Sequence, residues 1–303
     1  MASGTATNRT NIALPTEVSA EILQKTQDQS AVMRLARKVT LPGHGLTIPM
    51  ITSDPTAAWV DETDAKPVSN PGLTQKVMTG YKLAVIVPFS DEFRRDLATL
   101  YNQLVARLPL ALAQKFDATV FHGNAPGSNF DVLSSCTAQL ISTDAYAGLV
   151  AADADIATQG GIMNGFAISP QAKSILLGAV DQNKRPLFIN SVAEGAIPMI
   201  LGAPTVLTKA AYKAGTSPNP NVVGIAGDWT QALYGIVEDI KIDVSDQATL
   251  TAGTQDSPVT INLWQKNMFA VRAEIEIGFR ADTNCFDRLT AAASGATGAT
   301  GNT

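Results

Sequence analysis

The sequence has few residues of the kinds that carry catalytic chemistry. Its 303 residues include two histidines, His44 and His122, and two cysteines, Cys136 and Cys285. Neither histidine has a second ligand at metal-binding spacing, and two cysteines form no disulfide framework. We therefore expect no metal site, no cofactor and small buried thiols. The sequence contains no P-loop, GxSxG or GxGxxG string, which lowers the odds of an enzyme without excluding one.

Charge and long apolar runs are also scarce. Charged residues make up 16% of the chain, against about 25% in a typical domain, and the formal net charge is −5. A low charged fraction indicates either extensive subunit contacts or a large core. The negative charge argues against tight nucleic-acid binding, which needs clustered Lys and Arg. No apolar run approaches the ~18 residues of a membrane span, and we expect synthesis in the cytoplasm.

The most regular pattern is WQKNMFAVRAEIEIGFRADTNCF, residues 264–286. Odd positions from 269 to 279 are apolar, whereas even positions from 272 to 280 are mostly charged. This alternation predicts a strand with one apolar and one charged face. We expect the apolar face to pack under a helix. The charged face should be solvated surface or pair across subunits; it comprises Arg272, Glu274, Glu276 and Arg280.

A long helix is predicted over 90–123, because apolar residues recur there at helical spacing. Ser90 is the expected N-cap and Gly123 the expected end. Pro109 lies inside and should kink the helix, because it removes a backbone hydrogen bond. The rod would be ~45 Å long at 1.5 Å per residue.

The residues before this helix predict a long two-stranded hairpin. We expect it to rise through Trp59 and Val60, turn at an irregular Pro/Gly tip, and return as one strand over 73–87. An isolated hairpin is marginal in water, so something outside the subunit's own core should cover it.

Two short helices are predicted nearer the N-terminus, within TEVSAEILQKTQ and SAVMRLARKV. The second carries a basic cluster of Arg34, Arg37 and Lys38. A solvated helix face is the preferred interpretation, and contact with a neighbouring subunit or a packaged polyanion is the alternative.

Residues 125–235 have short alternating elements, typical of a compact α/β or α+β domain. FAIS predicts a strand, and Ser169 with Pro170 predicts the start of a helix. The tail TAAASGATGATGNT has low complexity and is expected to be disordered. The predicted fold class is α+β.

This order of elements suits contacts between neighbouring subunits better than it suits a monomer. Four stretches carry a resemblance: AAWVDETDAKPVS with YKLAVIVPFSDEFRRD, FAISPQAKSILLGAVDQNKRPLF with MILGAPTVLT, GIAGDWTQALYGIVEDIKIDVSD, and WQKNMFAVRAEIEIGFRADTNCFDRL. In this order, over nearly the whole chain, they resemble the major capsid proteins of tailed bacteriophages with the Hong Kong 97-type fold.

The resemblance implies a division of the chain into named parts. These are an N-terminal arm (1–50), an extended β-hairpin loop (51–88), the spine helix of the peripheral domain (89–124), an inserted α/β axial domain (125–235), peripheral-domain strands (236–290) and a disordered tail (291–303).

The resemblance also implies a function and partners. Hexamers and pentamers would tile the icosahedral head shell of a virion, assembled in the host cytoplasm around double-stranded DNA that is contacted non-specifically. Other implied partners are a portal and a decoration protein, with no membrane. The family's N-terminal scaffolding region has no match here. Either scaffolding is a separate protein or the chain begins near a cleavage site, and Met1 favours the former.

The type member of the family joins its subunits by Lys–Asn isopeptide bonds, assisted by a Glu. Lys66, Asn267 and Glu274 match these positions by motif. On one strand Asn267 and Glu274 would face opposite ways about 23 Å apart, so three subunits would have to meet. Ordinary surface residues of shared ancestry are the preferred interpretation of all three.

Two alternatives remain. An encapsulin, a bacterial compartment shell of the same fold, would hold cargo protein in place of DNA. A soluble α/β enzyme would have its site in 125–235, with a pocket of convergent polar groups. The long arm and hairpin favour the phage shell.

Overall fold

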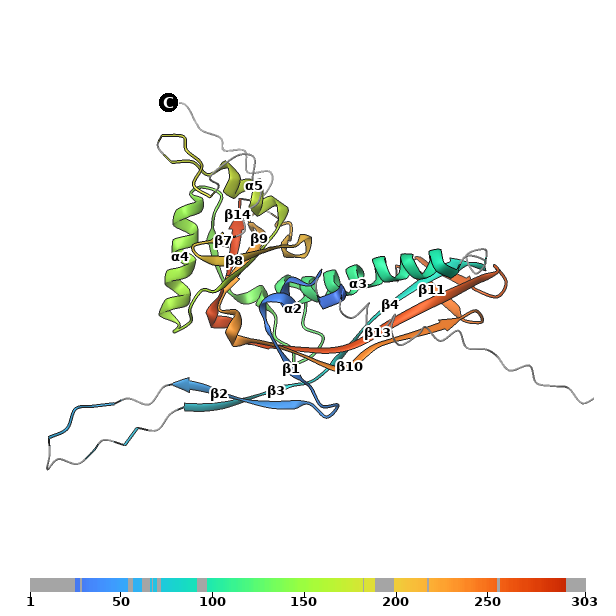
Figure 1. The fold of residues 1–303 in the computed structure, drawn as a ribbon, viewed down its shortest axis with the longest axis horizontal. Helices are drawn as coiled ribbons and strands as arrows, with labels where there is room; N and C mark the ends of the chain where they lie inside the picture. Colours follow the sequence, from blue (N-terminus) through green and yellow to red (C-terminus); the bar gives the residue numbers. More distant parts are fainter. Residues whose placement is uncertain are drawn as a thin grey trace, which may run out of the picture.

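The computed structural model describes residues 25–27, 29–53, 57–61, 66, 68–69, 72–91, 97–181, 183–188, 199–216, 218–254 and 257–292. Figure 1 shows three parts: a compact unit, a long flat unit in which α3 lies along a sheet, and the hairpin β2–β3, which projects beyond both. No helix among these residues is long and apolar enough to cross a bilayer.

The long flat unit is a four-stranded sheet in the order β1-β10-β13-β4. Its strands are β1 (Arg37–Thr40), β10 (Ala232–Ser245), β13 (Met268–Ala281) and β4 (Tyr81–Ser90). β13 is antiparallel to both β10 and β4. A separate two-stranded hairpin joins β10 to β13 and consists of β11 (Thr249–Thr254) and β12 (Ser257–Asn262).

The helix α3 (Leu97–His122) covers one face of this sheet, as Figure 1 shows. Its side chains Leu108 and Leu112 bury against the odd-numbered face of β13, which supplies Phe269, Val271, Ala273 and Ile275. The predicted packing of the apolar strand face under the helix is therefore confirmed. It follows from the period-2 and period-3.6 patterns, because each exposes one apolar side that must be covered.

The predicted start of the long helix falls on residues that the structure describes only in part. Ser90, expected as its N-cap, is the last residue of β4 and pairs with Met268. Residues 92–96 lie outside the described residues, so capping by Ser90 stays a prediction. Pro109 lies inside α3, and Gly123 follows its last residue, as predicted.

The compact unit is a six-stranded sheet in the order β5-β14-β9-β6-β8-β7. The strands are β5 (Thr137–Leu140), β6 (Gly165–Ile168), β7 (Met199–Ile200), β8 (Ala203–Leu207), β9 (Asn221–Gly227) and β14 (Phe286–Ala291). The helices are α4 (Ala145–Thr158) and α5 (Pro170–Gly178), the latter capped by Ser169 as predicted. Short 3₁₀ turns span Leu133–Ser135, Lys209–Ala211, Trp229–Gln231 and Thr283–Cys285.

The strand β14 lies apart from the other strands expected over 236–290. It pairs with β5 and β9, so it belongs to the compact unit. Both of its neighbours lie far away in the sequence, which is why no local pattern indicated this pairing. The predicted tail beyond Ala292 lies outside the described residues.

The hairpin differs from the predicted one. The strand expected over 73–87 is two strands, β3 (Gly72–Met78) and β4, separated at Thr79 and Gly80. The partner of β3 is β2 (Leu46–Ser53), whereas Trp59 and Val60 lie in no strand. The proline in β2, Pro49, is tolerated because β2 is an edge strand of a two-stranded ribbon.

The N-terminal region is also partly corrected. The helix α2 (Ala31–Leu35) is capped by Ser30 and ends before Ala36. Arg37 and Lys38 therefore lie in strand β1, parallel to β10, and only Arg34 lies on the helix. Most of the helix predicted further upstream, and all of residues 1–24, lie outside the described residues.

Candidate assembly surfaces

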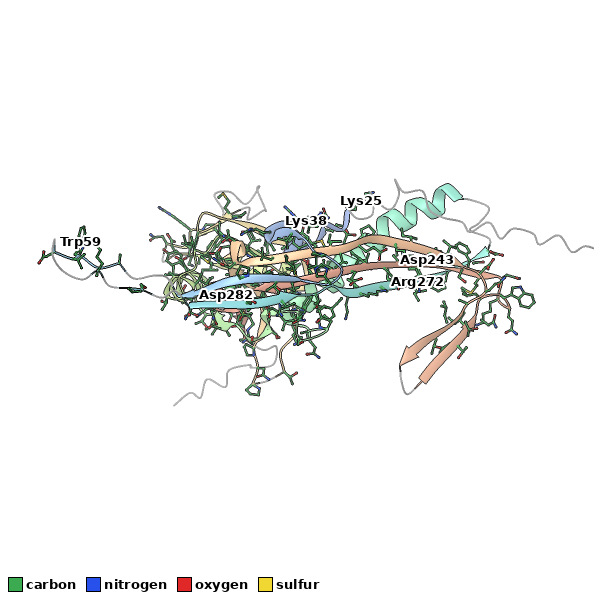
Figure 2. All side chains as sticks on the ribbon, turned by 90° about the horizontal axis from the view of Figure 1, so that it is seen from below. Lys25, Lys38, Trp59, Asp243, Arg272 and Asp282 are labelled. Atoms are coloured by element: carbon green, nitrogen blue, oxygen red, sulfur yellow. The ribbon has the colours of Figure 1, made fainter. Side chains whose placement is uncertain are left out.

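The segment beyond the hairpin is the most exposed apolar part of the described chain. Trp59 is 104% exposed and Val68 is 89% exposed. Figure 2 shows Trp59 at one extreme end of the molecule, beyond β2 and β3. A covered Trp ring buries about 150–250 Å² and is a common anchor of interfaces. Within the described part of the chain this ring has nothing to pack against, which makes it a candidate contact for a second molecule.

The base of the hairpin is held by Arg280, which the sequence placed on the charged face of β13. Its residue is 8% exposed. Its Nε donates to the carbonyl oxygen of Val77 at 2.8 Å, and one terminal nitrogen donates to Asp131 Oδ1 at 2.8 Å. The other donates to Asn129 Oδ1 at 3.1 Å and to the Ser128 carbonyl at 3.3 Å. The hairpin covers this end of the even-numbered face, so the prediction of a charged surface is wrong at Arg280.

Lys76 of β3 completes this network. Its Nζ donates to the carbonyl oxygen of Ala281 at 2.9 Å and lies 3.4 Å from Asp131 Oδ2. The same Oδ2 accepts the backbone N–H of Ala281 at 3.1 Å. Asp131 thus joins β3 to β13. Sequence analysis missed both Lys76 and Asp131, because neither belongs to a motif and the two lie far apart in the chain.

At the other end of β13, the charged face is solvent-accessible. Arg272 pairs with Asp243 of β10 at 2.7 Å and lies 3.7 Å from Glu274 on its own strand. Figure 2 shows Arg272 and Asp243 side by side. Arg272 and Glu274 are thus paired within the subunit.

The structure does not bring the three crosslink candidates together. Lys66 is exposed in the segment between β2 and β3, and Figure 2 shows Trp59 of that segment at the end of the molecule away from Arg272 of β13. Asn267 precedes β13 with a φ of 49°, so it is not on the strand as predicted. Its carbonyl accepts the backbone N–H of Asp91 at 2.9 Å. Any bond among the three needs separate subunits.

The cysteines are buried, as predicted. The Sγ–H of Cys136 donates to the Thr283 carbonyl at 3.2 Å. Burial raises the pKa of Cys136 to about 12 and that of Cys285 to about 11, so neither thiol ionises near neutral pH. No group of three His, Cys, Asp or Glu side chains within the described residues could hold a metal.

The histidines have separate environments. His44 is exposed in the turn before β2. At the end of α3, burial and the nearby Lys213 lower the pKa of His122, which favours the neutral ring. Lys213 Nζ donates to the His122 carbonyl at 3.0 Å, which satisfies an oxygen at the end of the helix.

A buried carboxylate on α3 fixes the N-terminal region, and sequence analysis did not single it out. Asp117 is 1% exposed and accepts hydrogen bonds from Ser30 Oγ, from the backbone N–H of Ala31 at 2.8 Å and from that of Val32 at 3.3 Å. It therefore binds the start of α2. Desolvation raises its pKa to about 6, against the effect of the three donors.

Comparisons with known proteins identify the class and then the family. The fold is shared with solved structures from Mycobacterium phage Ogopogo (TM-score 0.68, 18% identity, 87% of this chain and 92% of that one) and Gordonia phage Cozz (TM-score 0.67, 20% identity, 88% and 87%). It is the Hong Kong 97-type fold of tailed-phage capsids, as predicted. A model of the phage capsid family matches residues 10–281, and the chain belongs to that family.

Relatives in this family are similar over almost their whole length. The probable major capsid protein gp17 of Mycobacterium phage D29 is 31% identical over 297 residues, covering 93% of this chain and 91% of the relative. The major capsid protein of Staphylococcus phage 80alpha is 24% identical, covering 91% and 84%.

Proposed function

We propose that this protein is the major capsid subunit of a tailed bacteriophage, which assembles as hexamers and pentamers into an icosahedral head shell enclosing double-stranded DNA. Membership of the phage capsid family makes it a structural virion protein that associates with copies of itself. The observation that carries the proposal is the hairpin β2–β3, which holds the fully exposed Trp59 at one end of the molecule (Figure 2).

The physical argument concerns the apolar surface that one subunit leaves uncovered. Trp59, Val60 and Val68 belong to the segment beyond the hairpin and are all exposed. Apolar area removed from water stabilises an interface by about 25 cal/mol per Å². Exposed apolar side chains on a long projection suit contact with another copy in a lattice, because such a contact removes them from water.

Further partners belong to the same proposal. A separate scaffolding protein and a portal would act during assembly in the host cytoplasm, and a decoration protein would bind the finished shell. Packaged DNA would be contacted non-specifically. Crosslinking through Lys66, Asn267 and Glu274 would occur only where three subunits meet, and ladders on a gel of boiled shells would reveal it.

The family assignment decides between the alternatives raised by the sequence. The relatives named above are phage capsid proteins, which favours the phage shell over an encapsulin compartment. The same assignment argues against the soluble enzyme with a site in 125–235.

Negative-stain electron microscopy of the native protein tests the proposal. We expect closed shells or flat hexamer sheets from the wild-type chain, alone or with the scaffolding protein of the same phage. Trp59→Phe, which keeps an aromatic ring, should assemble like the wild type, whereas Trp59→Ser should yield mainly free subunits or capsomers. Small discrete oligomers from the wild type under every assembly condition would contradict the capsid function.

A further inference from the structure

The hairpin β2–β3 is attached to the long sheet without strand pairing. In the part of the chain that the structure describes, β2 and β3 form a two-stranded sheet of their own. No hydrogen-bond ladder therefore fixes the angle at which the hairpin leaves the body. Contacts at its base must do so, and they are of two kinds.

The first kind is a polar cluster, here called the hairpin clamp, made of Lys76, Asp131 and Arg280. Their side chains are 30%, 18% and 10% exposed, respectively. Each nitrogen of the Arg280 guanidinium donates a hydrogen bond, and Asp131 accepts through both carboxylate oxygens. Because a guanidinium is a planar fork, its bonds to Val77 of the hairpin and to Asp131 fix an orientation as well as a distance.

The second kind is a seat of two glycines. Gly235 and Gly278 pair across β10 and β13, on the face that the hairpin crosses. A Cβ on Gly278 would lie 2.7 Å from the Thr79 carbonyl oxygen, and one on Gly235 would lie 2.8 Å from Leu41 Cβ. Met78, at the end of β3, is fully buried there. The hairpin base thus rests directly on the sheet backbone, which fixes the place of crossing, while the clamp fixes its direction.

The direction in which the hairpin leaves the sheet matters because the hairpin is long. The seven residues of β3 span roughly 23 Å at ~3.3 Å each, so a tilt of about 10° at the base would move the far end by about 4 Å. Close-packed contacts do not tolerate such displacements. A small rotation at Arg280 therefore moves the Trp59 segment out of register with its contact surface.

We propose that the hairpin clamp is a positioning device for shell assembly: Lys76, Asp131 and Arg280 set the angle of the β2–β3 hairpin and so determine whether identical subunits close into shells of one size. This inference rests on the proposed capsid function. The three residues act by setting the angle of the hairpin, so they are positioning residues.

Two variants test the clamp, and one on the same strand is the control. Lys76→Met keeps the apolar stem but removes the donor to Asp131 and Ala281. Arg280→Lys keeps the charge but loses the fork that bonds Val77 and Asp131 together. Arg272→Lys alters an arginine eight positions away on β13 that pairs with Asp243 and is distant from the hairpin. Lys76→Met changes a partly exposed side chain, so it preserves a folded test case if Arg280→Lys does not fold.

The first readout is hydrogen exchange of the unassembled subunits. We expect amide exchange in β2–β3 to rise about tenfold in both clamp variants and to match the wild type in Arg272→Lys, with exchange in α3 unchanged in all three. Unchanged hairpin exchange in a folded clamp variant would overturn the inference, whether or not any shell forms.

The second readout is the diameter distribution of assembled particles by cryo-electron microscopy. The clamp variants should give mixed diameters or open sheets, with uniform closed shells reduced at least threefold, while Arg272→Lys should resemble the wild type. Uniform shells of wild-type diameter from both clamp variants would refute the positioning role. If the wild type forms no lattice, the capsid function is at fault and the exchange comparison still decides the clamp.

Discussion

Among single residues, Asp117 should make a contribution to stability that changes measurably with pH. Its pKa rises on folding from 3.8 to about 6, because burial disfavours its charge. The folded chain therefore binds more protons than the unfolded chain between about pH 4 and pH 6. The contribution of Asp117 to stability falls as the pH rises through that window.

Replacing Asp117 with Asn isolates this effect. The unfolding free energy of the wild type minus that of Asp117→Asn should increase by about 1–3 kcal/mol as the pH is lowered from 7 to 4. Urea unfolding of the unassembled subunits at several pH values measures it. Burial also raises the pKa of Asp287 to about 6. Asp287 is present in both proteins, so its contribution cancels in the difference between their unfolding free energies. If the difference in unfolding free energy did not change with pH, the raised pKa of Asp117 would be contradicted.

Phe116 tests the packing of α3 at the same scale. It is 3% exposed, and its ring lies edge-on to Phe130 and Phe279 with centroids 6.4 Å from each. Phe116→Ala should lower the unfolding free energy by about 3–5 kcal/mol, since it leaves a cavity in the core. Leu110→Ala, on the exposed side of the same helix, is the matched control and should cost less than about 1 kcal/mol. Equal losses of unfolding free energy in the two variants would argue against the assignment of Phe116 to the buried face of α3.

Among the elements, the hairpin should be the one that can be altered to block assembly without changing the stability of the subunit. Replacing residues 57–69 by a Gly/Ser linker of equal length removes Trp59, Val60 and Val68 but keeps β2 and β3. The unassembled variant should unfold at nearly the wild-type urea midpoint, because these side chains are exposed. It should form no closed shells in the electron microscope. Uniform shells from this variant would show that the segment has no role in the lattice.

Across the whole molecule, one core joins the compact unit to the long unit. Trp229 packs edge-on against Phe121 of α3 and Phe286 of β14, at centroid distances of 6.4 Å and 5.2 Å. Cys136 and Cys285 belong to the same cluster, together with residues of β9, β10 and β13. The two units therefore share buried surface, and we infer that they unfold together.

Thiol labelling checks this cooperativity. In urea, both cysteines should become alkylated in a single transition that coincides with the change in tryptophan fluorescence, since raised pKa values and burial protect them in the folded chain. Folded protein at pH 8 should label slowly at both positions. A separate early transition at either cysteine would mean that one unit unfolds alone.

Whether a feature could be predicted depends on how far apart its interacting residues lie in the sequence. The alternation from Phe269 to Phe279 and the helical spacing up to Val120 are local patterns, and both elements formed as predicted. The division of 73–87 into β3 and β4 was missed, because it depends on the seat that Gly235 and Gly278 provide. Arg280 was misplaced for the same reason, as its partner Asp131 is 149 positions away.

The sequence by itself determined the long helix, the amphipathic strand, the poverty of catalytic groups and the resemblance to phage capsids. These depend on periodicity, composition and motifs, which neighbouring residues specify. Only the tertiary structure decided that β14 joins the compact sheet, that β2 pairs with β3, and that Lys76, Asp131 and Arg280 meet under the hairpin. Backbone ladders and buried charges take their partners from distant parts of the chain, and folding alone brings those parts together.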